Sequence, residues 1–421
     1  MMREFEENRK VYQKALRGTY IIVPLKYIDE IQLEKMQIDG ATEKDFSSDD
    51  WSDLLVKKCE KKDTFVRWFL LPNENESIQI QDGVNITIAQ KQIFAFEKGI
   101  AFLSILLTYD NAKTQYVYEI INPGYLEEKK EELRKNILSW INAISICGQH
   151  SVFMPYVGKE ELTVKEAYLF HCALVGKRFQ NIETMEKLAF NEHKIIDISR
   201  EFEDPSEKDI TYTYGAKDVE KETYRWCACI SSQSISYLYA VEDKSLWNTE
   251  TIINTSIDDL LLTMLVLYQK NMCMLLNEEL RDTIQQNKER NFFKKIMELK
   301  KQALYFRASG TLVPSQISRW NNVCETYRRL LEVNGINESL EEIEQKIDLI
   351  KDEQERKSAE TQNYIATVIA VFGLISIIAA VLQIVDLMVG GSVQMIILFW
   401  LSCLGVVLFG ISWIILLLRK K

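Results

Sequence analysis

The residues best placed to do chemistry in this 421-residue sequence are the few polar and small side chains inside its long apolar C-terminal stretch. They recur at helical spacing and form one narrow stripe: Gln362, Ala366, Ile369, Gly373, Ser376, Ala380 and Gln383, followed by Asp386. If several copies met along this stripe, Ser376 and Gln383 would hydrate a conduction path, and rings of Asp386 would concentrate cations at its outer mouth. The alternative is that small residues only allow close helix packing. The candidate pore-lining residues are therefore Ile369, Gly373, Ser376, Ala380, Gln383 and Asp386.

A second candidate site is the basic cluster on a predicted helix over residues 281–309, which contains Lys288, Arg290, Lys294, Lys295, Lys300, Lys301 and Arg307. The apolar side of this helix is supplied by Phe292, Phe293, Ile296, Leu299, Ala303 and Phe306. The simplest interpretation is an amphipathic helix with a solvated basic face. Two functional hypotheses are more specific. The first is an anion or nucleotide site, whose candidate ligands are Arg290, Lys294, Lys295, Lys301 and Arg307. The second is a contact with acidic stalks of neighbouring subunits.

Sequence motifs for catalysis and metal binding are missing from the chain. There is no phosphate loop of the type GxxxxGK[ST], no GxGxxG after a strand, no HExxH, no GxSxG and no paired-cysteine zinc pattern. Only three histidines are present, and none pairs with another at helical ligand spacing. The sequence therefore predicts a protein that is not an enzyme, that requires no cofactor, and whose metal ligands are unknown.

Composition narrows the class of protein further. Glycine (16) and proline (6) together make up about 5% of the chain, against roughly 12% in typical usage, so helix should dominate. The net charge of −10 disfavours a nucleic-acid binder with a broad basic face. Eight cysteines without a CxxC pair are consistent with reduced thiols in a cytosol.

Two long apolar runs near the C-terminus, with Asp386 as their only charged residue, predict a transmembrane hairpin. The first span covers about 364–387 and the second about 393–418, each long enough to cross a bilayer core of roughly 30 Å. Basic residues flank the pair at Arg356-Lys357 and at Arg419-Lys420-Lys421, and the loop between the spans has none. Both termini should therefore be cytoplasmic, with the protein in the cell (inner) membrane.

A charged stalk is predicted before the first span. Between residues 338 and 362 the chain has nine acidic and four basic residues around an apolar seam at Ile336, Leu340, Ile343, Ile347 and Ile350. The alternating spacing of four and three residues is typical of a coiled coil, so this helix should need partners. Because no glycine or proline interrupts the chain from Ile336 to Gly373, stalk and first span should form one helix of about fifty residues.

The region before the stalk has the pattern of an α/β domain. Strands are predicted at 18–27 and 65–71, and hairpins around Asp82-Gly83, around Lys98-Gly99 and over 224–241. Helices are predicted at 125–146, at 163–189, after a capping start at Ser256, and over 316–333. A hairpin followed by a helix occurs twice, through either duplication or coincidence. The predicted division is a cytosolic α/β domain (1–310), a helical and coiled-coil stalk (311–362) and the transmembrane hairpin (363–421).

This layout resembles the CorA-like two-transmembrane metal transporter superfamily, best over the last hundred residues. In that family a Gly-Met-Asn tripeptide follows the first span, whereas this chain has Met388-Val389-Gly390-Gly391-Ser392 there, so magnesium selectivity is not implied. The resemblance implies a homopentamer with the first spans lining a pore. A divergent branch without the tripeptide accompanies type III CRISPR systems, and there a nucleotide second messenger, SAM-AMP (S-adenosylmethionine joined to AMP), acts on the cytosolic domain and leads to membrane disruption.

Three hypotheses for the function follow, and the first is favoured. It is a ligand-gated channel or pore-forming effector of antiviral defence, homo-oligomeric in the lipid bilayer, gated by a SAM-AMP-like messenger and without a nucleic-acid partner. The second is a divalent metal ion transporter of the magnesium type. The third is a membrane-anchored signalling or binding module without a pore.

Overall fold

The computed structural model divides the chain into two compact units: residues 1–287 with 298–343, and residues 288–297 with 344–421. The residues that it describes are 16–28, 31–59, 65–73, 76–81, 84–110, 113, 117, 127–155, 167–193, 213–285, 292–389, 397, 400 and 404–405. The predicted turn at Asp82-Gly83 and most of the predicted second span lie outside these residues.

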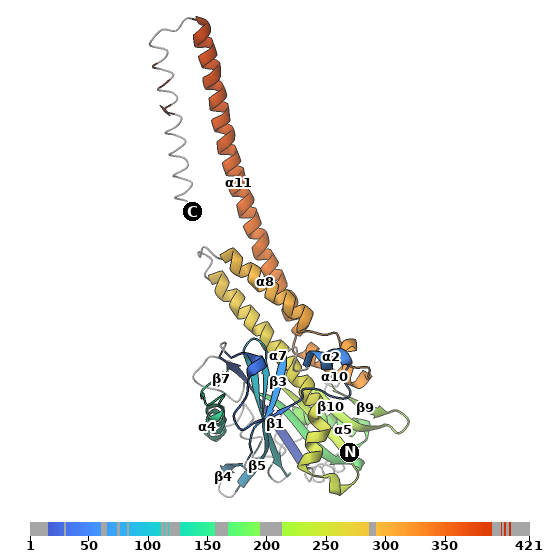
Figure 1. The fold of residues 1–421 in the computed structure, drawn as a ribbon. Helices are drawn as coiled ribbons and strands as arrows, with labels where there is room; N and C mark the ends of the chain where they lie inside the picture. Colours follow the sequence, from blue (N-terminus) through green and yellow to red (C-terminus); the bar gives the residue numbers. More distant parts are fainter. Residues whose placement is uncertain are drawn as a thin grey trace. The chain divides into compact units, whose positions relative to one another are not determined.

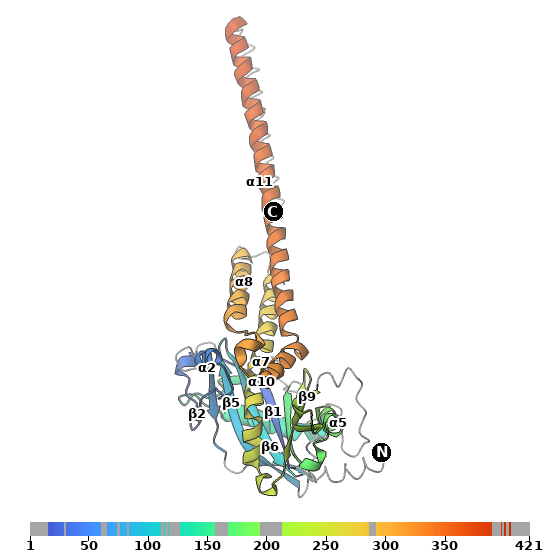
Figure 2. The same cartoon turned by 90° about the vertical axis from the view of Figure 1, so that its right-hand side faces the viewer.

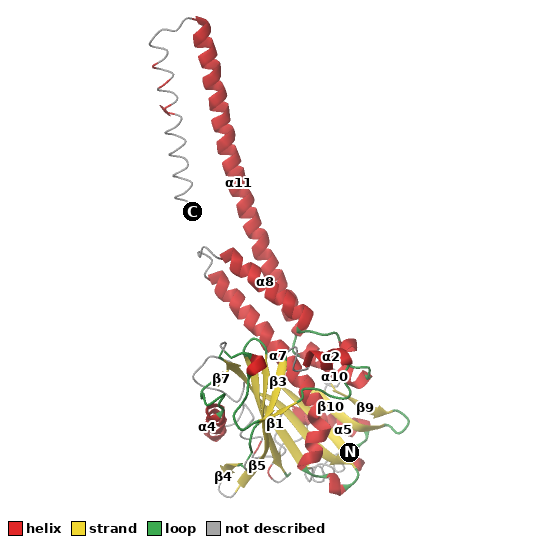
Figure 3. Ribbon diagram, viewed as in Figure 1, coloured by secondary structure: helices red, strands yellow, loops and turns green. Residues whose placement is uncertain are grey.

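An 11-stranded mixed sheet forms the body of the first unit (Figures 1 and 3). Its strand order is β2-β3-β5-β6-β1-β8-β11-β10-β9, with β4 paired to β5 and β7 paired to β1. Every strand pair is antiparallel except β8 with β11. The strands are β1 (Leu16–Tyr27), β2 (Thr42–Lys44), β3 (Val66–Leu70), β4 (Ser77–Gln81), β5 (Val84–Phe96), β6 (Ile100–Tyr109), β7 (Phe153–Pro155), β8 (Tyr168–Gly176), β9 (Thr213–Asp218), β10 (Thr223–Ile230) and β11 (Ser234–Val241).

Most of the predicted strands are confirmed. The stretches at 18–27 and 65–71 form β1 and β3, and each of the three predicted hairpins is an antiparallel pair: β4 with β5, β5 with β6, and β10 with β11. Between β5 and β6, Lys98 has φ 62° and Gly99 has φ 73°. Two successive residues with positive φ are what a tight turn of type I′ requires, which explains why Lys-Gly was a useful signal.

Helices cover both faces of the sheet (Figures 1 and 2). One face packs against α4 (Glu127–Ala143), through Leu133, Ile137 and Ile141, and against α5 (Ile182–His193). The other face packs against α7 (Thr249–Gln285), whose Tyr268 ring stacks on Phe96 with centroids 4.7 Å apart. Short elements complete the unit: η1 (Leu33–Lys35), α2 (Asp53–Cys59), η4 (Lys177–Phe179), η5 (Lys244–Leu246) and α9 (Pro314–Ile317).

The predicted helix over 163–189 is wrong along most of its length. Residues 168–176 form β8, a central strand buried along almost its whole length, and helix α5 begins only at Ile182. A strand covered on both faces is apolar without alternation, so its sequence does not differ from that of a buried helix.

The predicted start of the next helix at Ser256 is also wrong. Helix α7 begins at Thr249, where the Asn248 Oδ1 accepts a hydrogen bond of 2.8 Å from the Thr251 backbone N–H. Ser256 lies inside the helix, and its hydroxyl donates to the Ile252 carbonyl oxygen at 2.7 Å. A serine followed by acidic residues is thus not a reliable helix start where an asparagine cap precedes it.

The two predicted hairpin-and-helix units are not equivalent in space. The first hairpin is followed by α4 on one face of the sheet, whereas the second is followed by α7 on the opposite face. This placement favours coincidence over duplication.

The C-terminal part of the chain is helical, as predicted. The segment 281–309 is divided: residues 281–285 end α7, and α8 runs from Phe292 to Ser309. Within 316–333, α10 (Asn321–Val333) follows α9 after a break. Gly335, with φ 60°, then leads into α11 (Ile336–Val389), a single helix of 54 residues that confirms the predicted union of stalk and first span.

The predicted seam of the stalk is already covered within the single chain. Ile336, Leu340, Ile343 and Ile347 are all buried, whereas Leu349, beside the seam, is 68% exposed. Other residues of the same chain therefore cover the first part of this seam, and the expectation that the stalk helix needs partner chains stays a prediction.

Candidate functional site

The most unusual surface in the described chain is the apolar part of α11. Its large aliphatic side chains point outward all round the helix, and the following are more than half exposed: Ile365, Ile369, Leu374, Ile377, Ile378, Val381, Leu382 and Ile384. Soluble proteins rarely expose so continuous an apolar surface. A lipid bilayer is the solvent in which such a helix is stable, because all its backbone groups are paired internally.

The predicted pore-lining residues lie on α11. Ile369, Gly373, Ser376, Ala380 and Gln383 are exposed, and their spacing of four, three, four and three places them along one side of the helix. The Ser376 hydroxyl donates to the Phe372 carbonyl oxygen at 2.9 Å, so its own donor is satisfied within the helix. Asp386 belongs to α11, but its side chain lies outside the described residues.

Two described helices are long and apolar enough to cross a membrane: α7 and α11. In α7, 61% of the apolar window is buried inside the domain, whereas in α11 none of it is buried. Burial therefore identifies α7 as a core helix and leaves α11 as the candidate span. Of the predicted second span, 393–418, only residues 397, 400 and 404–405 are described, and Ile397, Trp400 and Leu404 are exposed.

The basic cluster lies on α8 as the amphipathic interpretation predicted. Phe292, Ile296, Leu299, Ala303 and Phe306 are buried, and the Phe306 ring meets the Tyr268 ring of α7 at a centroid distance of 6.0 Å. The basic side chains Lys294, Lys295, Lys301 and Arg307 are exposed, and Arg290 lies outside the described residues. The four described cations share one helix.

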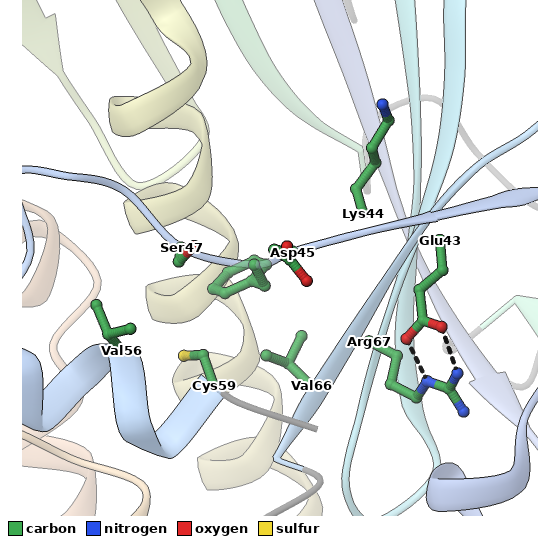
Figure 4. Close-up of a pocket in the computed structure, with 9 residues that line it drawn as sticks. Glu43, Lys44, Asp45, Ser47, Val56, Cys59, Val66 and Arg67 are labelled. Atoms are coloured by element: carbon green, nitrogen blue, oxygen red, sulfur yellow. Dashed lines mark hydrogen bonds and ion pairs between the residues drawn. The ribbon is translucent and has the colours of Figure 1, made fainter. Parts of the chain in front are cut away.

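Sequence reasoning missed a small pocket of about 340 Å³ near β2, β3 and α2 (Figure 4). The Arg67 guanidinium at this pocket already has partners. It donates to both Glu43 carboxylate oxygens, at 2.9 and 2.7 Å. It also donates to the backbone carbonyl oxygens of Leu33 and Glu34. Burial raises the pKa of the Cys59 thiol to about 12, so no thiolate nucleophile forms there near neutral pH. Arg67 holds Glu43 and the backbone in place, and the remaining polar lining consists of Lys44, Asp45 and Ser47.

A buried polar network between α7 and α10 was also missed. Gln269 of α7 donates to the Tyr327 hydroxyl of α10 at 2.9 Å and to the Gly310 carbonyl oxygen at 2.8 Å. Ten residues earlier on α7, the Asp259 carboxyl is hydrogen-bonded to Thr326 of α10, and burial raises its pKa from 3.8 to about 7. Because α10 leads directly into α11, this network fixes the start of the long helix on the sheet domain. The only sequence signal was a glutamine within an apolar helical run.

A buried ion pair tethers the middle of the sheet. Arg17 of β1 donates to the Glu192 carboxylate of α5 at 2.8 Å, and both side chains are almost fully buried. Thr19, on the same face of β1, contacts the Tyr109 hydroxyl at 2.7 Å and the His171 Nδ1 at 3.0 Å. His171 is therefore held in the core of the sheet by this contact.

Among the described residues, no group of three or more His, Cys, Asp or Glu side chains is arranged to hold a metal ion. Compared with known proteins, the chain matches no family model, no curated protein and no solved structure.

Proposed function

We propose that this protein is a homo-oligomeric membrane channel or pore-forming effector, whose cytosolic sheet domain controls a pore lined by α11. The observation that carries the proposal is the exposed apolar surface of α11, none of which is buried, on a helix continuous with the stalk. The polar stripe of Ser376 and Gln383 on this helix would supply the hydrated wall of the pore.

The gating ligand in this proposal is a nucleotide second messenger of the SAM-AMP type, acting in antiviral defence. This part rests on the resemblance to the CorA-like effectors of type III CRISPR systems, which share the plan of domain, stalk and two spans and also lack the Gly-Met-Asn tripeptide. For such a ligand to open the pore, it must bind the open arrangement more tightly than the closed one.

The test is ion flux through the purified full-length protein in liposomes, with and without SAM-AMP and related nucleotides. Ser376→Leu and Gln383→Leu should each reduce flux at least about tenfold without reducing membrane insertion, because leucine dehydrates the pore wall. Thr367→Leu is the matched control: it is half a helical turn from Ser376 in angle, and its hydroxyl makes the same bond, to the Asn363 carbonyl oxygen at 2.8 Å. Thr367→Leu should conduct normally.

The other outcomes separate the alternatives. Magnesium uptake without any nucleotide would favour the transporter. Absence of flux under all conditions, with Ser376→Leu and Gln383→Leu behaving as wild type, would favour a membrane-anchored module without a pore.

A further inference from the structure

Helix α8 presents a second, exposed stripe in addition to its buried face. This stripe, called here the α8 stripe, consists of Lys294, Met297, Lys301, Leu304 and Tyr305, at spacings of three and four residues. Its three large apolar residues, Met297, Leu304 and Tyr305, are 42%, 51% and 56% exposed. Glu298, also exposed, lies at the edge of this stripe. A stripe of large apolar side chains between two lysines is suited to packing against another helix rather than to facing water.

Helix α11 carries an exposed stripe of opposite charge before it becomes apolar. This acidic stripe consists of Glu338, Glu341, Asp348 and Asp352, continued by Gln345 and Leu349, and all six side chains are exposed. Its spacings are again three and four residues, on a different side of the helix from the buried seam at Ile336, Leu340, Ile343 and Ile347. Leu349 is an exposed apolar anchor within it.

The two stripes are opposite in charge and share the same periodicity. Lys294 and Lys301 are seven residues apart, as are Glu341 and Asp348, so both pairs repeat after two helical turns, about 10 Å. Two helices packed side by side could therefore bring each lysine opposite a carboxylate, with Leu349 among the apolar residues of the α8 stripe. Opposite charges flanking an apolar contact also define which helices pair and in which register.

We propose that the α8 stripe of one copy of this chain docks on the acidic stripe of α11 of a second copy. Because the two stripes are different surfaces, the contact is heterologous: each copy uses its α8 stripe on one neighbour and its acidic stripe on the other. A heterologous contact that closes on itself generates a ring, and a ring places equivalent helices around a central axis. The inference rests on the proposed function, which needs such a ring, and adds the surfaces that form it.

Charge reversal tests the docking, with particle mass measured for the full-length protein in lipid nanodiscs or detergent. Lys294→Glu with Lys301→Glu should weaken assembly about tenfold or more, and so should Glu341→Lys with Asp348→Lys, since each places like charges opposite one another. The fourfold variant that combines both pairs exchanges the charges and should recover most of the wild-type mass. The matched control, Lys57→Glu with Lys217→Glu, changes the charge equally at exposed lysines outside both stripes and should assemble as wild type.

The outcomes distinguish the inference from the function. If the protein is an oligomer that conducts ions but its mass is unchanged by either reversed pair, the docking is wrong while the channel stands. If both pairs lower the mass but the fourfold variant does not recover it, the two stripes do not contact each other and the docking is likewise wrong. If the wild-type protein is a monomer in lipid, both fail.

Discussion

Helices α7 and α11 each contain a long apolar stretch, and the surroundings of the two stretches are opposite. Both are long and apolar enough to span a bilayer, yet 61% of the apolar window of α7 is buried in the sheet domain and none of that of α11 is buried. Length and apolarity alone would therefore assign two spans to the described chain, of which one is a core helix. The difference lies in how each helix satisfies its polar side chains.

In α7, several polar groups bond to other elements. Gln269 reaches the backbone of Gly310 and the hydroxyl of Tyr327, and Ser256 lies 3.2 Å from the Tyr20 hydroxyl. In the apolar part of α11, the hydroxyls of Thr367 and Ser376 donate to carbonyl oxygens of their own helix, four residues back. A helix whose polar groups bond within the helix needs no protein around it. This is what a bilayer requires, because the bilayer core contains no water to bond with those groups.

The largest expected difference between α7 and α11 is their response to an aspartate in the apolar stretch of each helix. Leu262 of α7 is fully buried, whereas Leu374 of α11 is 62% exposed. Leu262→Asp buries a carboxylate without a partner and should lower the free energy of unfolding of the domain by about 4 kcal/mol or more. Leu374→Asp should leave that free energy unchanged but cost about 3 kcal/mol of membrane insertion. Thermal unfolding and vesicle flotation measure the two effects, and a destabilised domain in Leu374→Asp would contradict the assignment of α11.

A smaller difference in stability is expected when alanine replaces a glycine packed against α7 and a glycine within α11. A Cβ on Gly18 of β1 would lie 2.8 Å from Ile252 of α7, whereas a Cβ on Gly373 would meet nothing within 4 Å. Gly18→Ala should force α7 away from the sheet and lower the free energy of unfolding by about 2 kcal/mol. Gly373→Ala should not change it. Chemical denaturation of both variants checks the pair, and equal losses would mean that Gly373 is packed against the protein.

The stability of the sheet domain should depend on pH because of one acidic residue of α7, Asp259. Burial raises the pKa of Asp259 to about 7 in the folded protein, above its unfolded value of 3.8. The stability that this shift contributes is complete below about pH 4 and is lost as the pH rises through 7, because the unfolded chain then releases the proton more readily.

Asp259→Asn should therefore flatten the fall in stability between pH 4 and 7. It should gain up to about 4 kcal/mol at pH 8 relative to wild type, because a difference of one in pKa corresponds to about 1.4 kcal/mol. Glu278→Gln, at an exposed position of the same helix, is the control and should leave the profile unchanged. Unfolding curves from pH 4 to 8 measure both variants. A wild-type slope in Asp259→Asn would show that another group is responsible.

Local signals predicted the strands and the long helix well. The turn dipeptide Lys98-Gly99 predicted a hairpin, and the absence of glycine and proline from Ile336 to Gly373 predicted the long helix. The error at β8 arose because full burial on both faces removes the alternation that marks a strand. The start of α7 was misplaced because Asn248 and Ser256 carry similar capping signals, and only tertiary packing decides between them.

The candidate sites were predictable to different degrees. The exposed face of α8 followed from periodicity, since its apolar and basic residues alternate at helical spacing. The network of Gln269, Tyr327 and Asp259 depends on two helices far apart in sequence, and no local pattern reports such a contact. The stalk seam was recognised, but whether it is covered by the same chain or by another depends on the fold around it.

The most direct test of the account is the sidedness of the loop after α11 in intact cells. Ser392→Cys places a thiol between the two predicted spans, whereas Cys147, the exposed native cysteine among the described residues, belongs to the sheet domain. A membrane-impermeant maleimide should label Ser392→Cys in intact cells and should label Cys147 only after permeabilisation. If Ser392→Cys is labelled only after permeabilisation, α11 does not cross the membrane and the channel proposal is wrong.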